Sequence, residues 1–267
     1  MIEPFVESDI PSFIAMAVAE GWICGAWEFQ FLLQSFPQGC LAWREEGKTL
    51  GYITSLRHEN SGWIGNLLVT SEARRRGIGA KLMEGALDAL LSARVATVWL
   101  TASAKGVGLY RKLGFLPIDS INRWKGTGRN ESSAERLVHQ DLQTMREVDR
   151  AGWGDRRDGL LDVTVGRGWS YCGEHSFLCC QPWEEGTQIG PWGALRETQA
   201  ELLLNRALGG LSGPVFLDVP AGNLAVAAML TKRKFSIAGS NTLMYLGAQP
   251  SYDNEKIFAL ASMGSMG

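Results

Sequence analysis

The stretch Arg74–Ala80 contains residue types that could bind a phosphate-bearing ligand. Three arginines, Arg74, Arg75 and Arg76, precede Gly77-Ile78-Gly79-Ala80, and the apolar periodicity of a helix begins at Ile78. Backbone N–H groups and the dipole at a helix N-terminus attract anions, and glycine allows close backbone approach because it has no Cβ. The pattern predicts a pyrophosphate-binding loop. The alternative is a solvated arginine run beside an ordinary glycine turn.

A second group with possible chemistry is Tyr110, in the sequence Leu109-Tyr110-x-x-Leu113-Gly114-Phe115. A phenol with a pKa of about 10 stays protonated at neutral pH and can donate a proton to a departing group. The alternative is a core tyrosine that packs a short helix onto the sheet.

Strands and helices alternate around these residues. Apolar patterns predict strands at 40–44, 50–57, 63–69 and 95–101, with helices near residues 9–18, 28–35, 78–91 and 107–112. The second half has a similar order, with helices around 141–150, 195–208 and 223–234 and strand-like stretches at 161–165, 176–180, 215–219 and 240–246. We therefore expect two α/β domains related by a diverged repeat, residues 1–125 and 137–267, joined by a polar linker at 126–136.

Composition limits the classes of function. The net charge of −2 gives no general basic surface, and we expect neither nucleic acid nor a membrane as a partner. The five cysteines have no C-x-x-C spacing and the three histidines are isolated, so we expect reduced thiols in the cytoplasm and no metal site. Any anion binding must therefore be local.

The order and spacing of these pieces resemble the acyl-CoA site of the GNAT superfamily of N-acetyltransferases. The resemblance implies two tandem domains, each a mixed, mostly antiparallel twisted sheet flanked by helices. It implies acetyl-CoA as co-substrate, held at a β-bulge and at the phosphate loop, with no metal. The residues that it assigns to acetyl-CoA are Leu67, Leu68, Val69, Arg74, Arg75, Arg76, Gly77, Ile78, Gly79 and Ala80, with Ser103 and Gly106 as further contacts. Tyr110 matches the tyrosine that protonates the departing CoA sulfur.

The second half resembles the degenerate acetyltransferase-like domain that follows the GNAT domain in YitH-type tandem proteins. The matching residues are Gly154–Arg157, Ile189-Gly190-Pro191, and Asp218-Val219-Pro220 with Asn223. No basic glycine loop occurs at the corresponding place. We therefore expect this domain to bind coenzyme A poorly and to cover the acceptor side of the first domain.

The residues that would handle the acceptor are less clear from sequence. Trp22 and Trp27 lie in the segment after the first helix, and in the family that the chain resembles this segment borders the acceptor cleft. Core packing is an equal alternative. Many GNAT enzymes carry a carboxylate base on the strand where this chain has Asn66, which cannot act as a base but could orient the amine or a water. Glu59, a water chain or a residue of the second domain stay open as the base.

The resemblance therefore implies an acyltransferase that moves an acetyl group from acetyl-CoA to a primary amine of a small molecule, by direct attack in a ternary complex. A non-catalytic acyl-CoA sensor and a protein lysine or N-terminal acetyltransferase are the alternatives. We expect a monomer or a homodimer.

Overall fold

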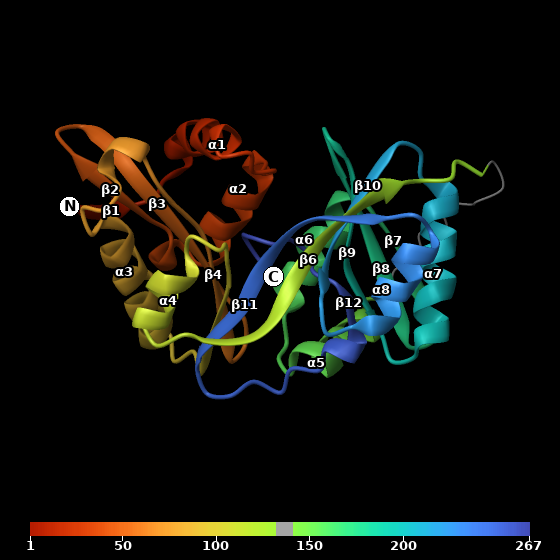
Figure 1. Cartoon of the computed structure of the whole chain (residues 1–267). Coiled ribbons are helices and arrows are strands. Elements are labelled where there is room, and N and C mark those ends of the chain that lie inside the picture. Colours follow the sequence, from red (N-terminus) through yellow and green to blue (C-terminus); the bar gives the residue numbers. More distant parts are fainter. Residues whose placement is uncertain (132–140) are drawn as a thin grey trace. The chain divides into compact units, whose positions relative to one another are not determined.

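The structure is a computed structural model that describes residues 1–131 and 141–267, and it divides into two compact units (Figure 1). Unit 1 comprises Met1–Leu100 with Leu246–Ala248 and Gly264–Met266. Unit 2 comprises Thr101–Tyr245 with Gln249–Met263 and Gly267. Arg74–Ala80 therefore belongs to unit 1 and Tyr110 to unit 2. The units are described one at a time.

The sheet of unit 1 has the strand order β1-β2-β3-β4-β5. Its strands are β1 (Ile2–Pro4), β2 (Leu41–Glu45), β3 (Lys48–Arg57), β4 (Ser61–Val69) and β5 (Thr97–Ala102). Neighbouring strands are antiparallel except for β4 and β5, which are parallel. Parallel neighbours need a crossover, and α3 (Ile78–Ser92) supplies it.

Helices α1 (Ile10–Ala19) and α2 (Ala26–Ser35) pack through a cluster of aromatic rings. The Phe13 and Phe29 ring centroids lie 4.5 Å apart, and Phe5 lies 5.0 Å from Tyr52 of β3. Helix α3 buries one apolar stripe at helical spacing, made of Ile78, Leu82, Met83, Ala86, Leu87 and Leu90. Single 3-10 turns, η1 (Glu7–Asp9), η2 (Pro37–Gly39) and η3 (Ser71–Ala73), connect these elements.

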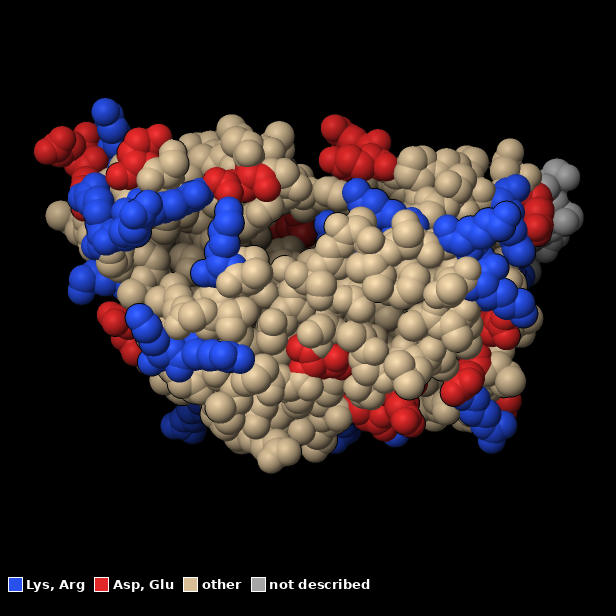
Figure 2. Space-filling model, in the orientation of Figure 1, with Lys and Arg blue, Asp and Glu red and all other residues tan. Residues whose placement is uncertain are grey.

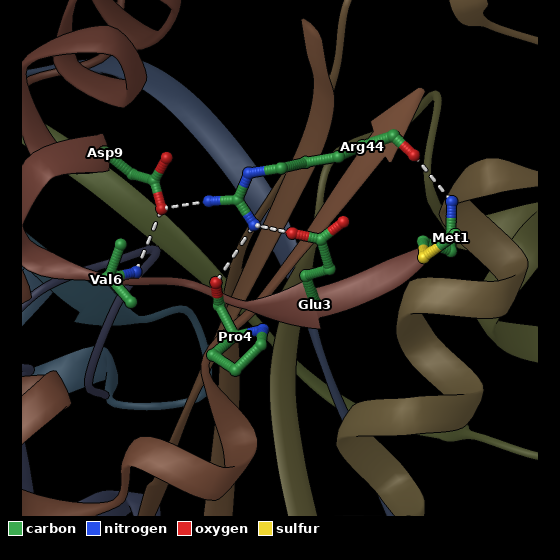
Figure 3. Close-up of polar contacts among 6 residues, drawn as sticks. All are labelled: Met1, Glu3, Pro4, Val6, Asp9 and Arg44. Atoms are coloured by element: carbon green, nitrogen blue, oxygen red, sulfur yellow. Dashed lines mark hydrogen bonds and ion pairs between the residues drawn. The ribbon is translucent and has the colours of Figure 1, made fainter. Parts of the chain in front are cut away.

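Arg44 connects the start of the chain to β2 (Figure 3). Its guanidinium donates to Asp9 at 2.6 Å, to Glu3 at 3.2 Å and to the carbonyl of Pro4 at 3.2 Å. The N-terminal amine of Met1 donates to the carbonyl of Arg44 at 2.6 Å. These contacts hold a short edge strand that contributes little to the core, so we assign them a structural role.

The sheet of unit 2 has the order β11-β6-β10-β9-β8-β7, with β12 paired to β9. Its strands are β6 (Leu116–Thr127), β7 (Trp169–Gly173), β8 (Ser176–Trp183), β9 (Gly186–Ala194), β10 (Pro214–Pro220), β11 (Ser236–Gly247) and β12 (Ile257–Ala259). Its helices are α4 (Val107–Lys112), α5 (Leu142–Trp153), α6 (Asp158–Arg167), α7 (Glu197–Gly210) and α8 (Leu224–Lys232), with one 3-10 turn, η4 (Asn254–Lys256). Again a single neighbouring pair, β9 and β10, is parallel.

Two sequence predictions are wrong. The apolar run Leu161–Val165 is part of helix α6, where Thr164 bonds back to the carbonyls of Leu160 and Leu161. A short buried apolar run has no periodicity that separates strand from helix.

The second wrong prediction concerns the start of the expected linker. Residues 126 and 127 belong to β6 and pair with Val215 and Pro214. The rest of the expected linker from residue 132 onward lies outside the described residues.

The mixed, mostly antiparallel sheet flanked by helices is confirmed. Within the described residues, no helix is both long and apolar enough to cross a membrane. No disulfide joins the five cysteines, all of which the structure describes.

Candidate active site

The loop before α3 presents its backbone toward solvent. Gly77 is the N-cap residue of α3 and has φ +82°, and Arg75 has φ +64°. The first N–H that bonds back into the helix is that of Lys81, to the carbonyl of Gly77 at 3.1 Å. The N–H groups of Ile78, Gly79 and Ala80 therefore have no acceptor within the helix. A left-handed turn followed by free helix donors is a suitable site for phosphate oxygens.

Gly79 is not required by packing within the protein. A Cβ added there would lie 3.8 Å from the Cγ2 of Val69 and 3.9 Å from the Cδ2 of Leu67, which are ordinary contact distances. Its φ is not in the left-handed region either. A glycine at this position leaves room for a ligand to approach the backbone closely.

The arginines of the loop have carboxylate neighbours. Arg74 donates to the carbonyl of Val69 at 3.1 Å and forms an ion pair with Glu20. Arg76 pairs with Glu45 at 2.6 Å, and hydrogen bonds from Trp43 and then from Arg76 lower the pKa of the Glu45 carboxyl. Figure 2 shows acidic and basic side chains together at the end of unit 1 that carries the β2–β3 hairpin. The positive charge is therefore local and partly compensated.

Strand β4 contains a bulge directly before Leu67-Leu68-Val69. Tyr52 of β3 pairs with Leu68 and Thr54 pairs with Gly65, so β4 has one residue more than β3 between these pairs. Asn66, at the bulge, has φ +56° and is buried, and its amide donates to the Thr54 hydroxyl at 2.9 Å. Asparagine tolerates this left-handed conformation. A bulge takes N–H groups out of the ladder, where they can bind a ligand carbonyl.

The pairing of β4 with β5 ends just before that bulge. The parallel register runs from Ser61 with Thr97 to Trp63 with Trp99, and it covers no residue of β4 beyond Trp63. From Ile64 onward, the described residues include no β5 partner for β4. The bulge therefore lies on the part of β4 that has no β5 partner among the described residues.

Tyr110 lies in α4 of unit 2. Its ring packs edge-on against Phe115 with centroids 6.1 Å apart, and no described residue forms a hydrogen bond with its hydroxyl. Burial raises the pKa of Tyr110 to about 12, so the phenol keeps its proton across the neutral range. A Cβ at Gly106 would lie 3.0 Å from the ring, which explains this glycine by packing. Exposed Ser103 begins the turn into α4, because its carbonyl accepts from the N–H groups of Gly106 and Val107.

The other expected acceptor residues are spread over unit 1. Trp22 follows α1 and is 38% exposed, and Trp27 lies in the first turn of α2. Glu59 is exposed in the turn between β3 and β4, and the rise of a strand puts that turn roughly 20 Å from Asn66. We therefore assign Glu59 no part in the chemistry at the bulge.

Models of known families match both halves of this chain. Residues 12–115 match the "Acetyltransferase (GNAT) family", and residues 145–259 match an "Acetyltransferase (GNAT) domain". The chain is a tandem GNAT acyltransferase. Proteins of the GNAT family use acetyl-CoA as co-substrate. The first match contains both the loop and the Tyr110 motif, while the second begins after the residues that are not described.

Individual relatives have the same organisation. The Bacillus subtilis protein named "Uncharacterized N-acetyltransferase YitH" is 20% identical over 220 residues, which is 74% of each protein. A solved structure from Pyrococcus horikoshii, named as an assumed acetyltransferase, has a TM-score of 0.86 at 23% identity and covers 100% of this chain and 95% of its own. The solved structure of a GCN5-related N-acetyltransferase from Sphaerobacter thermophilus has a TM-score of 0.65 at 16% identity. The match covers 95% of this chain and 97% of that protein. At these identities the two structures establish the fold.

The second GNAT domain has a bulge at the corresponding place. Leu178 of β8 pairs with Trp192 and Cys180 pairs with Ile189, so β9 gains a residue at Gly190-Pro191. Proline has no N–H, so this bulge has one donor fewer than the bulge at Asn66-Leu67. Between β9 and α7 there are only residues 195 and 196, whereas residues 70–77 separate β4 from α3. The second domain therefore has no connection of comparable length at this place.

The chain itself fills the space between the parallel strands of the second domain. Strands β9 and β10 pair only through Thr187 with Val215 and Gln188 with Phe216. Beyond that point, β12 pairs with β9 and the N–H of Leu260 donates to the carbonyl of Asp218 on β10 at 2.8 Å. A Cβ at Gly190 would lie 1.9 Å from the Leu260 carbonyl oxygen.

The polar residues that marked the second half in sequence have structural roles. Asp218 is fully buried and accepts two hydrogen bonds from Arg123, at 2.7 and 2.8 Å. Asn223 caps α8 by accepting from the N–H of Val226 at 3.1 Å. Its amide also donates to the carbonyls of Asn254 and Ile257 at 3.0 Å.

Sequence reasoning missed Glu28, a carboxylate that is 2% exposed in α2. The spacing Gly25-x-x-Glu28 is that of a capping residue, and Glu28 accepts from the N–H of Gly25 at 3.0 Å. Its other oxygen accepts from the hydroxyl of Ser265 at 2.6 Å. A contact between residues so far apart in sequence leaves no local signal.

Proposed function

We propose that the first GNAT domain transfers an acetyl group from acetyl-CoA to the primary amine of a small molecule, by direct attack in a ternary complex. The observation that carries the proposal is the pair of donor groups in one unit, the N-terminus of α3 and the bulge of β4. In the domain division that we propose, residues 1–125 bind acetyl-CoA and residues 137–267 do not.

Each donor group suits a different part of acetyl-CoA. The N–H groups of Gly79 and its neighbours, with Arg74, Arg75 and Arg76, suit the pyrophosphate, since helix donors and arginines both favour it. The backbone of Leu67, Leu68 and Val69 suits the pantetheine arm and the thioester carbonyl, which needs donors where negative charge develops. Ser103 and Gly106 are proposed contacts to the arm on motif position alone.

Tyr110 is proposed as the acid that gives a proton to the CoA sulfur as the thiolate leaves. Its motif position and its raised pKa support this role, because the phenol is protonated at the pH of the reaction. Asn66 is proposed to fix the bulge, and Trp22 and Trp27 are proposed apolar surfaces for the acceptor. We also propose a cytoplasmic location, which fits five cysteines without a disulfide.

A charge substitution at Gly79 tests the proposal. Gly79→Glu places a carboxylate in the first turn of α3. There the negative charge interacts favourably with the helix dipole but repels a pyrophosphate. We expect acetyl-CoA affinity to fall about 100-fold, and Gly79→Gln, of equal size but uncharged, to lose about tenfold. Calorimetry measures both, and thiol release against a panel of primary amines measures turnover.

The same titration counts the sites. We expect one molecule of acetyl-CoA per chain, because the second domain lacks the loop and its strand gap is filled. Equal affinity of the Glu and Gln variants would exclude the loop as the pyrophosphate site. Tight binding without turnover of any amine would favour the sensor alternative.

A further inference from the structure

Residues Gly264–Met266 belong to unit 1 and lie against β4. A Cβ added at Gly65 would lie 2.3 Å from the carbonyl oxygen of Gly264 and 2.9 Å from the Cα of Ser265. Gly65 is therefore a position where another backbone packs directly on the strand. Ser265 and Met266 are themselves buried, so this segment is part of the folded unit.

Glu28 fixes this segment from the opposite side. Its carboxylate accepts the hydroxyl proton of Ser265 at 2.6 Å and the N–H of Gly25 at 3.0 Å. Hydrogen bonds to a charged group are the stronger ones, and the carboxylate is 2% exposed. The segment is thus held between the N-terminus of α2 and the surface of β4.

The segment borders the place where we expect the reaction. Gly65 immediately precedes Asn66 of the bulge, and consecutive Cα atoms are about 3.8 Å apart. If the thioester carbonyl binds at the bulge, the segment lies one residue from the reacting carbon. An extended peptide laid along β4 at Gly65 would collide with the backbone of residues 264–266.

We propose that Gly264–Met266 form one wall of the acceptor site, that Glu28 positions this wall through Ser265, and that the wall restricts the acceptor to small primary amines. The proposal rests on the proposed function of the first domain. Glu28 is a positioning residue in this scheme, and it acts on acceptor choice without contacting the acetyl group. The restriction is steric, and it separates small amines from lysine residues in peptides.

Three variants of the full chain test the wall. Ser265→Ala and Glu28→Gln weaken the hydrogen bond between Ser265 and Glu28 that holds the wall. Gly65→Ala adds a Cβ that displaces the wall from β4. Ser55→Ala is the matched serine control, because Ser55 is buried in the same unit and its hydroxyl has no partner among the described residues. Gly166→Ala, where a Cβ meets open space, is the glycine control.

The readout is the ratio of kcat/KM for benzylamine to kcat/KM for a short lysine peptide. We expect this ratio to fall about tenfold in the three variants, through a higher kcat/KM for the lysine peptide, with the KM for acetyl-CoA unchanged. We expect the wild-type ratio in both controls. A merely structural role would alter both substrates and both KM values together.

Two results would contradict the proposal that Gly264–Met266 form a wall of the acceptor site. One is an unchanged ratio in Ser265→Ala, the mildest variant, while that protein still turns over benzylamine. The other is a wild-type protein that acetylates the peptide as well as benzylamine. In both cases acetyl transfer by the first domain stands. Loss of all amine turnover in the wild type, with acetyl-CoA bound, instead refutes the proposed function and the wall with it.

Discussion

The two GNAT domains have a bulge at the same point of the equivalent strand and differ in what surrounds it. In the first domain the bulge is Asn66-Leu67, the adjoining strand edge has no β5 partner, and a loop with free helix donors follows. In the second the bulge is Gly190-Pro191, β12 lies in the gap, and two residues replace the loop.

We propose that this difference is how one fold keeps its shape and loses a ligand site. The splayed parallel strands leave backbone groups that must be satisfied by a ligand, water or the protein itself. In the second domain the Leu260 N–H and the Gln181 amide satisfy such groups. In the first domain β4 has no β5 partner beyond Trp63 among the described residues, and we propose that the backbone groups at its bulge bind a ligand. The comparison predicts that changes at the two bulges have different consequences.

The largest effect is expected when the first bulge is given the proline of the second. Leu67→Pro removes one N–H, and we expect kcat to fall about 100- to 1000-fold, as for loss of a donor to a developing negative charge. Leu67→Ala, which keeps the N–H, should stay within about tenfold. Retained calorimetric affinity for coenzyme A verifies that the proline variant folds. A proline variant as active as the alanine variant contradicts the role of the bulge.

Next in size is the loss of the phenol. We expect Tyr110→Phe to lower kcat about 100-fold with little change in acetyl-CoA affinity, because only proton donation is removed. Since the pKa of Tyr110 is raised to about 12, the acid form persists as pH rises, and kcat of the wild type should show no loss from this group up to about pH 10. Stopped-flow thiol detection across pH measures both. Unchanged turnover in the variant removes Tyr110 from the mechanism.

A change in the filled gap of the second domain should alter stability and leave turnover per folded molecule intact. Gln181 donates to the carbonyls of Gly190 at 2.6 Å and Ala261 at 3.0 Å. Gln181→Ala leaves both carbonyls without this donor, and we expect about 2 kcal/mol of destabilisation and a Tm lower by about 5 °C. Exposed Gln143→Ala is the control. A loss of kcat without a loss of Tm would give this gap a part in the reaction.

The smallest effect concerns the carboxylate beside the loop. Glu20→Gln frees Arg74 from its ion pair, and we expect acetyl-CoA to bind about two- to threefold more tightly at low salt, with the gain reduced at high salt. Glu84→Gln, on the exposed face of α3, removes an equal charge as the control. Equal affinities of the two variants mean that Glu20 does not compete with the phosphates.

The sequence by itself determined the features that depend on neighbouring residues. Strand 63–69, the glycine loop and helix 78–91 follow from local propensity, from the absence of a Cβ and from apolar spacing, and the structure has β4, Gly77 and α3 there. The mixed, mostly antiparallel sheet was instead implied by the resemblance to the GNAT superfamily. The local pattern failed at 161–165, because burial on one helix face and in a strand gives the same short apolar run.

Only the tertiary structure decided which segments of the chain pack beside the two bulges. Asn66 falls in the predicted strand 63–69, and Gly190 precedes a proline. Neither position indicates that Leu260 packs on Gly190 in one domain or that Gly264 packs on Gly65 in the other. The contact of Glu28 with Ser265 joins residues 237 apart. Such contacts depend on the folded path of the whole chain, and local sequence carries no energetic preference for them. The acceptor side of this enzyme was therefore not predictable from spacing.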